Sequence, residues 1–158
     1  MLFRKIIYMY NLTPSPISVE KLYDNQTWIH GDPNVRDINL TIFIITIEDE
    51  QLLFNDKDAM ACADRLHKLG VGEVVIKMGE DGCFVSAGKI NEMVPLSEIR
   101  QSQDTTGAGD SFNGAYLAAR LAGKDCVAAA SIAHLIAREV IMHPGAIIPK
   151  NAMPEVKP

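Results

Sequence analysis

The sequence predicts an α/β domain in which helices flank a mixed sheet. The first observation is the run at 40–47, which is β-branched at most positions and therefore typical of a strand covered on both faces. The second is a pair of shorter strand patterns around a glycine-containing turn. The third is a set of helix-like segments with capping residues at their ends, so that strands and helices follow one another along the chain.

The chain divides near Asn39 into two unequal parts. Residues 1–39 form an irregular segment, because turn residues interrupt it and its apolar positions keep neither a helical nor a strand period. Residues 40–158 are regularly patterned. The strand at 40–47 opens this part, and we expect the acidic residues Glu48–Glu50 to end it.

A helix, a strand and a hairpin are expected next. Residues 56–69 carry apolar side chains on one side and precede Gly70, a typical helix stop. The pattern at 73–77 predicts a strand. The turn at 79–82 then leads to another strand at 83–86, which must run antiparallel to the first because the loop is short.

The last part of the chain predicts two helices. They cover residues 110–121 and 125–142, with Gly123 between them and His143-Pro144-Gly145 as the closing signal. The resulting order of strand, helix, strand, strand, helix and helix is typical of an α/β domain with a mixed sheet.

Composition excludes several classes of function. With 158 residues, 47% of them hydrophobic and 22% charged, the chain matches one soluble globular domain. A net charge of -5 without a basic cluster argues against nucleic-acid binding. Neither a membrane span nor a signal peptide is expected. Cys62, Cys83 and Cys126 are widely spaced, which predicts buried thiols in a cytoplasmic protein.

The segment Asp104-Thr105-Thr106-Gly107-Ala108-Gly109-Asp110 carries the candidate chemistry. Gly107 and Gly109 stand at a helix start, where backbone N–H groups and the helix dipole stabilise a phosphoryl group. Asp110 in the first turn would stay ionised and accept a proton from a hydroxyl bound there. The alternative is that Asp104 and Asp110 only cap the helix beside an ordinary glycine-rich turn.

The run Asp-Thr-Thr-Gly-Ala-Gly-Asp-Ser-Phe-x-Gly, which begins at Asp104, closely resembles the C-terminal signature of the ribokinase-like, or PfkB-type, carbohydrate kinases. The resemblance covers residues 40–154. It implies the C-terminal half of a ribokinase-like fold, with a mixed, mostly parallel sheet flanked by helices. It also implies that Gly107–Gly109 form an anion hole and that Asp110 is the catalytic base.

Residues 74–82 resemble the Lys-x-Gly-x-x-Gly strand and turn that lie beside the nucleotide phosphates in this family. Taken alone, Lys77 is better explained as a solvated lysine at a strand end before a hairpin. Together with the signature, the resemblance implies an ATP site formed by Lys77, Gly79, Gly82, Thr105, Thr106, Gly107 and Gly109.

The resemblance also implies metal sites. Glu50 matches the acid of the family's Asn-x-x-Glu element, which helps to order Mg2+ through water, although Ile47 replaces the asparagine. Many members bind a monovalent cation such as K+ beside the anion hole. Here that site would be formed by Asp104, Thr106 and the loop at 143–145.

Two further stretches narrow the expected substrate. The tail at 143–154 and the acid-rich stretch at 46–53 resemble the 2-keto-3-deoxygluconate kinases of this family. For His134 and His143, packing and capping are the preferred interpretation over metal ligation, because no second ligand has suitable spacing.

The resemblance is incomplete at the N-terminus. Members of the family are about twice as long as this chain, and their N-terminal half supplies most sugar contacts and a lid. Asp32–Arg36 matches the family's Asp-x-Asn-x-Arg element, with a poorer match at Asp24-Asn25. Neither is correctly placed, because too few residues separate Arg36 from the strand at Leu40 to hold a crossover helix.

Three hypotheses on function follow. The first is in-line phosphoryl transfer from ATP, with Mg2+, to a hydroxyl of a sugar acid, with Asp110 as the base. The second is a truncated, inactive remnant that binds nucleotide only, because catalysis by positioning fails when the sugar is not held. The third, a dinucleotide-binding oxidoreductase, fails because the glycines lie at the wrong end of the chain. Self-association through the apolar face left by the absent half is also expected.

Overall fold

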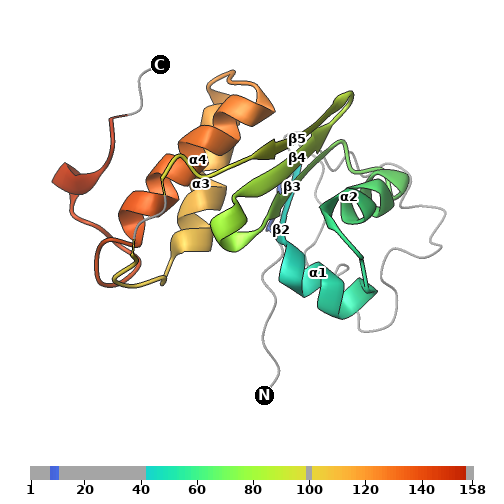
Figure 1. The fold of residues 1–158 in the computed structure, drawn as a ribbon. Coiled ribbons are helices and arrows are strands. Elements are labelled where there is room, and N and C mark those ends of the chain that lie inside the picture. The colour runs from blue at the N-terminus through green and yellow to red at the C-terminus, as the bar shows by residue number, and fades with distance from the viewer. Residues whose placement is uncertain (1–7, 11–41, 99–100, 156–158) are drawn as a thin grey trace.

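The structure, a computed structural model, describes residues 8–10, 42–98 and 101–155. A sheet lies between two layers of helices (Figure 1). The strands are β1 (Tyr8–Tyr10), β2 (Ile42–Thr46), β3 (Glu73–Lys77), β4 (Cys83–Ala87) and β5 (Ile90–Val94). The helices are α1 (Ile47–Phe54), α2 (Ala59–Lys68), α3 (Ala108–Leu121) and α4 (Cys126–Val140), with short 3-10 turns η3 (Gly79–Asp81) and η4 (Lys150–Ala152). The predicted α/β class is confirmed.

The sheet is mixed, as the sequence predicts. Neighbouring strands pair in the order β1-β2-β3-β4-β5. Only β2 and β3 are parallel among the described strands, with Ile42 opposite Glu73 and Thr46 opposite Lys77; the other pairs are antiparallel. The expected parallel majority is therefore not found in this part of the chain. The reason is that the short connections on either side of β4 can only close hairpins.

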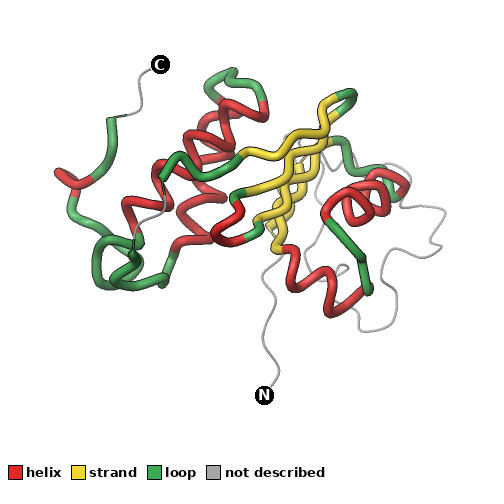
Figure 2. The backbone as a smooth tube through the Cα atoms, viewed as in Figure 1, coloured by secondary structure: helices red, strands yellow, loops and turns green. Residues whose placement is uncertain are grey.

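Successive residues of the central strands face two different hydrophobic cores. In β2, Ile42 and Ile44 pack on the side of α3 and α4, whereas Phe43 and Ile45 pack on the side of α1 and α2. β3 alternates in the same way, with Val75 facing α3 and α4. Figure 2 shows the strands between the two pairs of helices. Because both faces are covered, these strands are apolar at nearly every position.

The acidic residues after β2 begin a helix, whereas the sequence analysis expected them only to end the strand. β2 stops at Thr46, and Glu48, Asp49 and Glu50 form the first turn of α1. Acidic side chains are favourable there because the helix dipole places partial positive charge at the N-terminus. α1 ends at Phe54, and the C-cap residue Asn55 has a φ of 57°, in the left-handed region typical of a helix end.

The edge strand β5 was also missing from the prediction. It follows β4 through a tight turn at Gly88, which has a φ of 60°, and Ala87 lies opposite Ile90. Residues 90–93 are exposed and only Val94 is buried. The strand therefore lacks the apolar alternation by which a half-buried strand is recognised, and pairing with β4 defines it.

The other helices agree with the prediction. α2 and α4 lie within the expected ranges, and α3 begins two residues before its expected start at Asp110. Aspartates cap two of these helices at their N-termini. Asp58 accepts a hydrogen bond from the Ala61 N–H at 2.8 Å, and Asp125 accepts one from the Ala128 N–H at 2.8 Å. Each cap satisfies a backbone donor that has no partner within its helix.

Most of the irregular N-terminal segment, including the matches at Asp32–Arg36 and Asp24-Asn25, lies outside the described residues. Within the described part, no helix has the length and apolar character needed to cross a membrane. Helices cover both faces of the described central strands, so the exposed apolar surface lies elsewhere. It includes Leu52 (83% exposed), Leu121 (69%) and Ile147 (92%).

Candidate active site

α3 begins at a tight turn that requires glycine. Gly107 occupies the N-cap position with a φ of 79°, in the left-handed region. A Cβ atom added there would lie 2.7 Å from the Cβ of Ala146 and 2.9 Å from its Cα, so the C-terminal loop packs directly on this glycine. The Ser111 N–H donates to the Gly107 carbonyl at 2.9 Å and closes the first helical turn.

The first turn of α3 combines backbone donors with an acid. N–H groups of a first helical turn have no acceptor within their own helix, and here they include those of Gly109 and Asp110. The Ala108 N–H instead donates to the Thr105 carbonyl at 3.2 Å. Gly109 and Asp110 are both exposed. This end of α3 can therefore stabilise an anion that approaches from the solvent.

Lys77 brings positive charge to the same turn. It is the last residue of β3, and its Nζ lies 3.3 Å from the position that a Cβ of Gly109 would occupy. The same Nζ donates to Oδ1 of Asn113 at 3.2 Å. Burial lowers the pKa of Lys77, and the negative charges of Asp110 and Asp49 oppose this effect. An ammonium group and carboxylates therefore converge at the start of α3.

Polar contacts also fix the opposite end of β3 on α3. Glu73 is only 5% exposed and accepts a hydrogen bond from the Tyr116 hydroxyl at 2.7 Å. Arg120 donates to both carboxylate oxygens of Glu73, at 3.0 and 2.7 Å. Because strand side chains alternate, Glu73 and Lys77 lie on the same face of β3. β3 is thus hydrogen-bonded to α3 at both ends, through Glu73 and through Lys77. These contacts fix the position of Lys77 along the helix axis.

Asp104 fastens the loop before α3 to the C-terminal loop. Its Oδ1 accepts the Thr106 N–H at 2.8 Å, and its Oδ2 accepts the Gly145 N–H at 2.8 Å. These hydrogen bonds, with the one from Gly145 as the largest cause, hold the pKa of Asp104 below its usual value. The structure thus brings together Asp104, Thr106 and the loop at 143–145, the residues expected at the monovalent-cation site.

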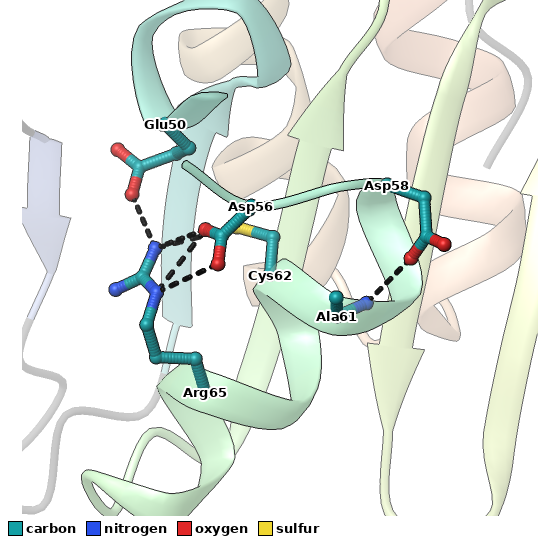
Figure 3. A network of polar contacts seen from close by, with 6 residues as sticks. All are labelled: Glu50, Asp56, Asp58, Ala61, Cys62 and Arg65. Carbon is teal, nitrogen blue, oxygen red and sulfur yellow. Dashed lines mark hydrogen bonds and ion pairs between the residues drawn. The ribbon is translucent and has the colours of Figure 1, made fainter. Parts of the chain in front are cut away.

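Glu50 is held by α2 (Figure 3). Its Oε2 accepts a hydrogen bond from Nη2 of Arg65 at 2.6 Å, and only 5% of the side chain is exposed. The same guanidinium pairs with Asp56 at 2.6 Å and lowers its pKa through this hydrogen bond. Ligand atoms of Glu50, Asp56 and Cys62 lie within 4.8 Å of one another. Arg65 already binds both carboxylates, however, so the cluster is an ion-pair network.

Gly79 and Gly82 form the turn that directly follows Lys77 and Met78. Gly82 has a φ of 96°, and an added Cβ would overlap the carbonyl oxygen of Val94 and lie 2.9 Å from the Cα of Pro95. Packing of the hairpin therefore explains this glycine. Gly79 has a φ of 57° and open space around it. The expected roles of both glycines and of exposed Thr105 in binding nucleotide stay predictions.

The site also includes Asn113 and Asp49, which the sequence motifs do not single out. Asn113 lies four residues after Gly109, and this spacing places both on one face of α3, which was an available signal. Asp49 follows β2, and the ends of parallel strands β2 and β3 meet at one edge of the sheet. Recognising α1 as a helix would have placed this acid near Lys77.

The histidines have structural contacts, as expected. His134 is 8% exposed, packs edge-on against Phe112 with ring centroids 5.0 Å apart, and hydrogen-bonds the Val94 carbonyl at 3.2 Å. Burial lowers the pKa of His134. His143 lies 3.2 Å from Glu139 one helical turn earlier.

Known proteins match this chain in sequence over most of its length. 2-Dehydro-3-deoxygluconokinase of Escherichia coli K12 is 44% identical over 116 residues, which cover 72% of this chain and 38% of that protein. An uncharacterized sugar kinase of Archaeoglobus fulgidus is 34% identical over 108 residues, covering 68% of this chain and 42% of the relative. The chain thus spans less than half the length of these relatives.

Solved structures match the fold. A ribokinase of Thermotoga maritima aligns with a TM-score of 0.61 and 25% identity, covering 73% of this chain and 39% of that one. An E. coli putative ribokinase II in complex with ATP and Mg2+ aligns with a TM-score of 0.61 and 28% identity, over 68% of this chain and 35% of the other. The family model of pfkB family carbohydrate kinases matches residues 24–153. The chain therefore belongs to the pfkB family of carbohydrate kinases.

Proposed function

We propose that this chain binds ATP and transfers its terminal phosphoryl group to a hydroxyl of a sugar or sugar acid. The observation that carries the proposal is the convergence of Lys77, Asp110 and the first-turn amides of α3. Membership of a kinase family supports it. The 44% identity to 2-dehydro-3-deoxygluconokinases favours 2-keto-3-deoxygluconate as the substrate.

Each residue at this helix end has a distinct proposed role. Asp110 takes the proton of the attacking hydroxyl, because its carboxylate is exposed beside the place where an anion would bind. The anion hole at Gly107–Asp110 stabilises charge on the transferring phosphoryl group through backbone N–H groups at the start of α3, although the Ala108 N–H already donates to the Thr105 carbonyl. Lys77 adds a positive charge on the sheet side. Most of the rate would come from holding the two reactants in line.

Acidic residues at this edge of the sheet suit a magnesium ion carried by the nucleotide. Asp49 and Asp110 are the acids whose charges act on Lys77, and carboxylate oxygen is a preferred ligand of magnesium. Asp49 would hold the ion directly or through water, which leaves Asp110 to act as the base. Bound magnesium would neutralise charge on the phosphates. Glu50, the acid assigned by sequence resemblance, is engaged by Arg65, so its part in binding stays a prediction.

Two further expectations belong to this proposal. Binding of a monovalent cation such as K+ at Asp104 and Thr106 stays a prediction. In the structure the Asp104 carboxylate accepts hydrogen bonds from the backbone N–H groups of Thr106 and Gly145. A cytoplasmic location is supported by the cysteines Cys62, Cys83 and Cys126, which are buried and unpaired.

The test is a coupled kinase assay with ATP, magnesium and 2-keto-3-deoxygluconate, run beside an ATP-binding titration. The variants are Asp110→Asn, which keeps the shape of the side chain but removes the base, and Asp64→Asn, a matched control on the exposed side of α2. Asp110→Asn should lower turnover by about 10²- to 10⁴-fold, the usual contribution of a general base, while ATP still binds. The control should behave as the parent.

The outcomes separate the proposal from its alternative. Turnover that depends on Asp110 would support an active kinase. ATP binding without turnover on any sugar acid would favour the nucleotide-binding remnant, in which the substrate is not held. A chain that neither binds ATP nor turns over would refute both. Replacing 2-keto-3-deoxygluconate by ribose in the same assay tests the substrate class.

We also propose self-association through the α3 side of the molecule. An apolar groove of about 640 Å³ lies there between α3, α4 and residues 146–153. Its lining includes Ala118, Ala122, Ile147 and Met153, and the last two are 92% and 48% exposed. Burial of such surface is favourable. Sedimentation of the parent and of Ile147→Asp should show a dimer only for the parent, and a monomeric parent would refute the proposal.

A further inference from the structure

Asn113 is a buried polar residue whose side-chain amide contacts Lys77. The side chain lies on α3 and is only 1% exposed. Its Oδ1 accepts from Nζ of Lys77 at 3.2 Å. Its Nδ2 has no hydrogen-bond partner among the described residues. An unsatisfied donor in such a place destabilises the fold, so a purely structural side chain would be apolar.

The orientation of the amide follows from the chemistry of its neighbour. A lysine ammonium has only donors, so the amide must turn its oxygen toward Lys77 and its NH2 group away. The lone donor is therefore a consequence of the contact with Lys77. A hydrocarbon side chain would avoid the unsatisfied donor but would leave the ammonium without this acceptor.

Gly109 also lies close to the ammonium group of Lys77. Gly109 and Asn113 are four residues apart and so share one face of α3. A Cβ at Gly109 would come within 3.3 Å of Nζ, so a larger side chain there would displace the ammonium. The head group of Lys77 thus lies over one face of α3, close to the backbone at Gly109 and to the amide oxygen of Asn113.

We infer that Asn113 is a positioning residue that holds the ammonium of Lys77 against the anion-binding turn of α3. The inference deepens the proposed function and rests on it for its consequence, the binding of a nucleotide phosphate. A neutral acceptor suits this role because it directs the ammonium without cancelling its charge. A carboxylate at the same position would pair with Lys77 and compete with the phosphates.

The test uses two substitutions with opposite expected effects on Lys77. Asn113→Asp is isosteric and places a negative charge about where Oδ1 lies, so it should raise the pKa of Lys77 by about 1 or more. Asn113→Ala removes the acceptor and should lower that pKa. Asn151→Asp and Asn151→Ala, at an exposed position in η4, are the matched controls.

The pKa of Lys77 is followed by NMR of protein labelled at the lysine ¹³Cε, with the signal assigned from Lys77→Arg. The affinity for ATP and magnesium is measured on the same samples, and circular dichroism confirms that each variant is folded. Both Asn113 variants should bind ATP about tenfold more weakly, the factor expected for one hydrogen bond to a charged group. The Asn151 controls should change neither quantity.

Opposite shifts of the Lys77 pKa in folded variants would support the inference, because loss of packing alone gives no reason for a shift whose sign follows the charge at 113. The same Lys77 pKa in the parent and both Asn113 variants would overturn it, whether or not ATP binds. A parent that does not bind ATP would refute the proposed function. The titration of Lys77 would then still decide whether Asn113 holds the ammonium.

Discussion

Substitution of Gly107 by alanine tests how the anion-binding turn is held. Gly107 combines a φ of 79° with close packing, because an added Cβ would lie 2.7 Å from the Cβ of Ala146 and 2.9 Å from its Cα. The nearer atoms belong to a short side chain and to backbone, so the clash cannot be relieved by rotating a flexible side chain. The turn before α3 or the loop at Ala146 must move.

The expected loss of stability has two parts. A side chain in the left-handed region costs about 1–2 kcal/mol relative to glycine. Forcing an extra methyl group into a packed site adds about 1–3 kcal/mol. Gly107→Ala should therefore lower the free energy of unfolding by about 2–5 kcal/mol, provided the two parts add.

Two other glycines separate these parts. Gly145 has the same φ of 79° but open space around an added Cβ, so Gly145→Ala should cost only the backbone part, about 1–2 kcal/mol. Gly114 lies within α3 with open space and an ordinary helical φ. Gly114→Ala should stabilise the protein by about 0.5–1 kcal/mol, because alanine favours a helix interior.

The assay is urea unfolding of the parent and the three variants, followed by circular dichroism at 222 nm under identical conditions. The order of stability should be Gly114→Ala, parent, Gly145→Ala and Gly107→Ala, from most to least stable. If Gly107→Ala were as stable as Gly145→Ala, the close packing of Gly107 against Ala146 would make no difference to the free energy of unfolding. The account of how α3 is anchored would then be refuted.

Three further substitutions test the hydrogen bonds and ion pairs of charged side chains. Asp104→Asn should lower the melting temperature at pH 7. Because hydrogen bonds hold the folded pKa of Asp104 below its unfolded value of about 3.9, its contribution is present above that pH and is lost as the pH falls through the folded value. Melting curves between pH 2.5 and 7 should therefore converge at acid pH, and a constant difference would contradict this reasoning. Arg120→Met leaves buried Glu73 without its cation and should cost about 3 kcal/mol in urea unfolding. Arg138→Met, whose partner Glu98 is half exposed, should cost less than about 1 kcal/mol, and equal losses would count against burial as the deciding factor.

Elements with strong local signals could be predicted from the sequence. β3 was expected at its observed bounds, because a β-branched run is flanked by glycines. α1 was missed because its acidic first turn resembles a polar strand end; the preceding Thr46 at the N-cap position was the signal that could have revealed it. β5 was missed because it is largely exposed, and only its pairing with β4 defines it.

The candidate site was predictable where one local segment forms it. The tight turn at Gly107 follows from the signature. The contact between Lys77 and Asn113 could not be predicted in this way. The two residues are 36 positions apart in sequence, and they meet only when β3 packs against α3 in the folded chain. The binding of Glu50 by Arg65 likewise joins two helices and has no local signal.

The alternation of β3 between two cores has a consequence for changes in chain length. Inserting or deleting one residue within the strand would turn its end over, so that the ammonium now at the start of α3 would point toward α2 instead. Val75 would exchange sides with its neighbours at the same time. A change of two residues would keep every side chain on its own side while shifting Lys77 along the helix axis. The number of residues in β3 therefore sets both the side of the sheet on which the Lys77 ammonium lies and its distance from the turn at Gly107.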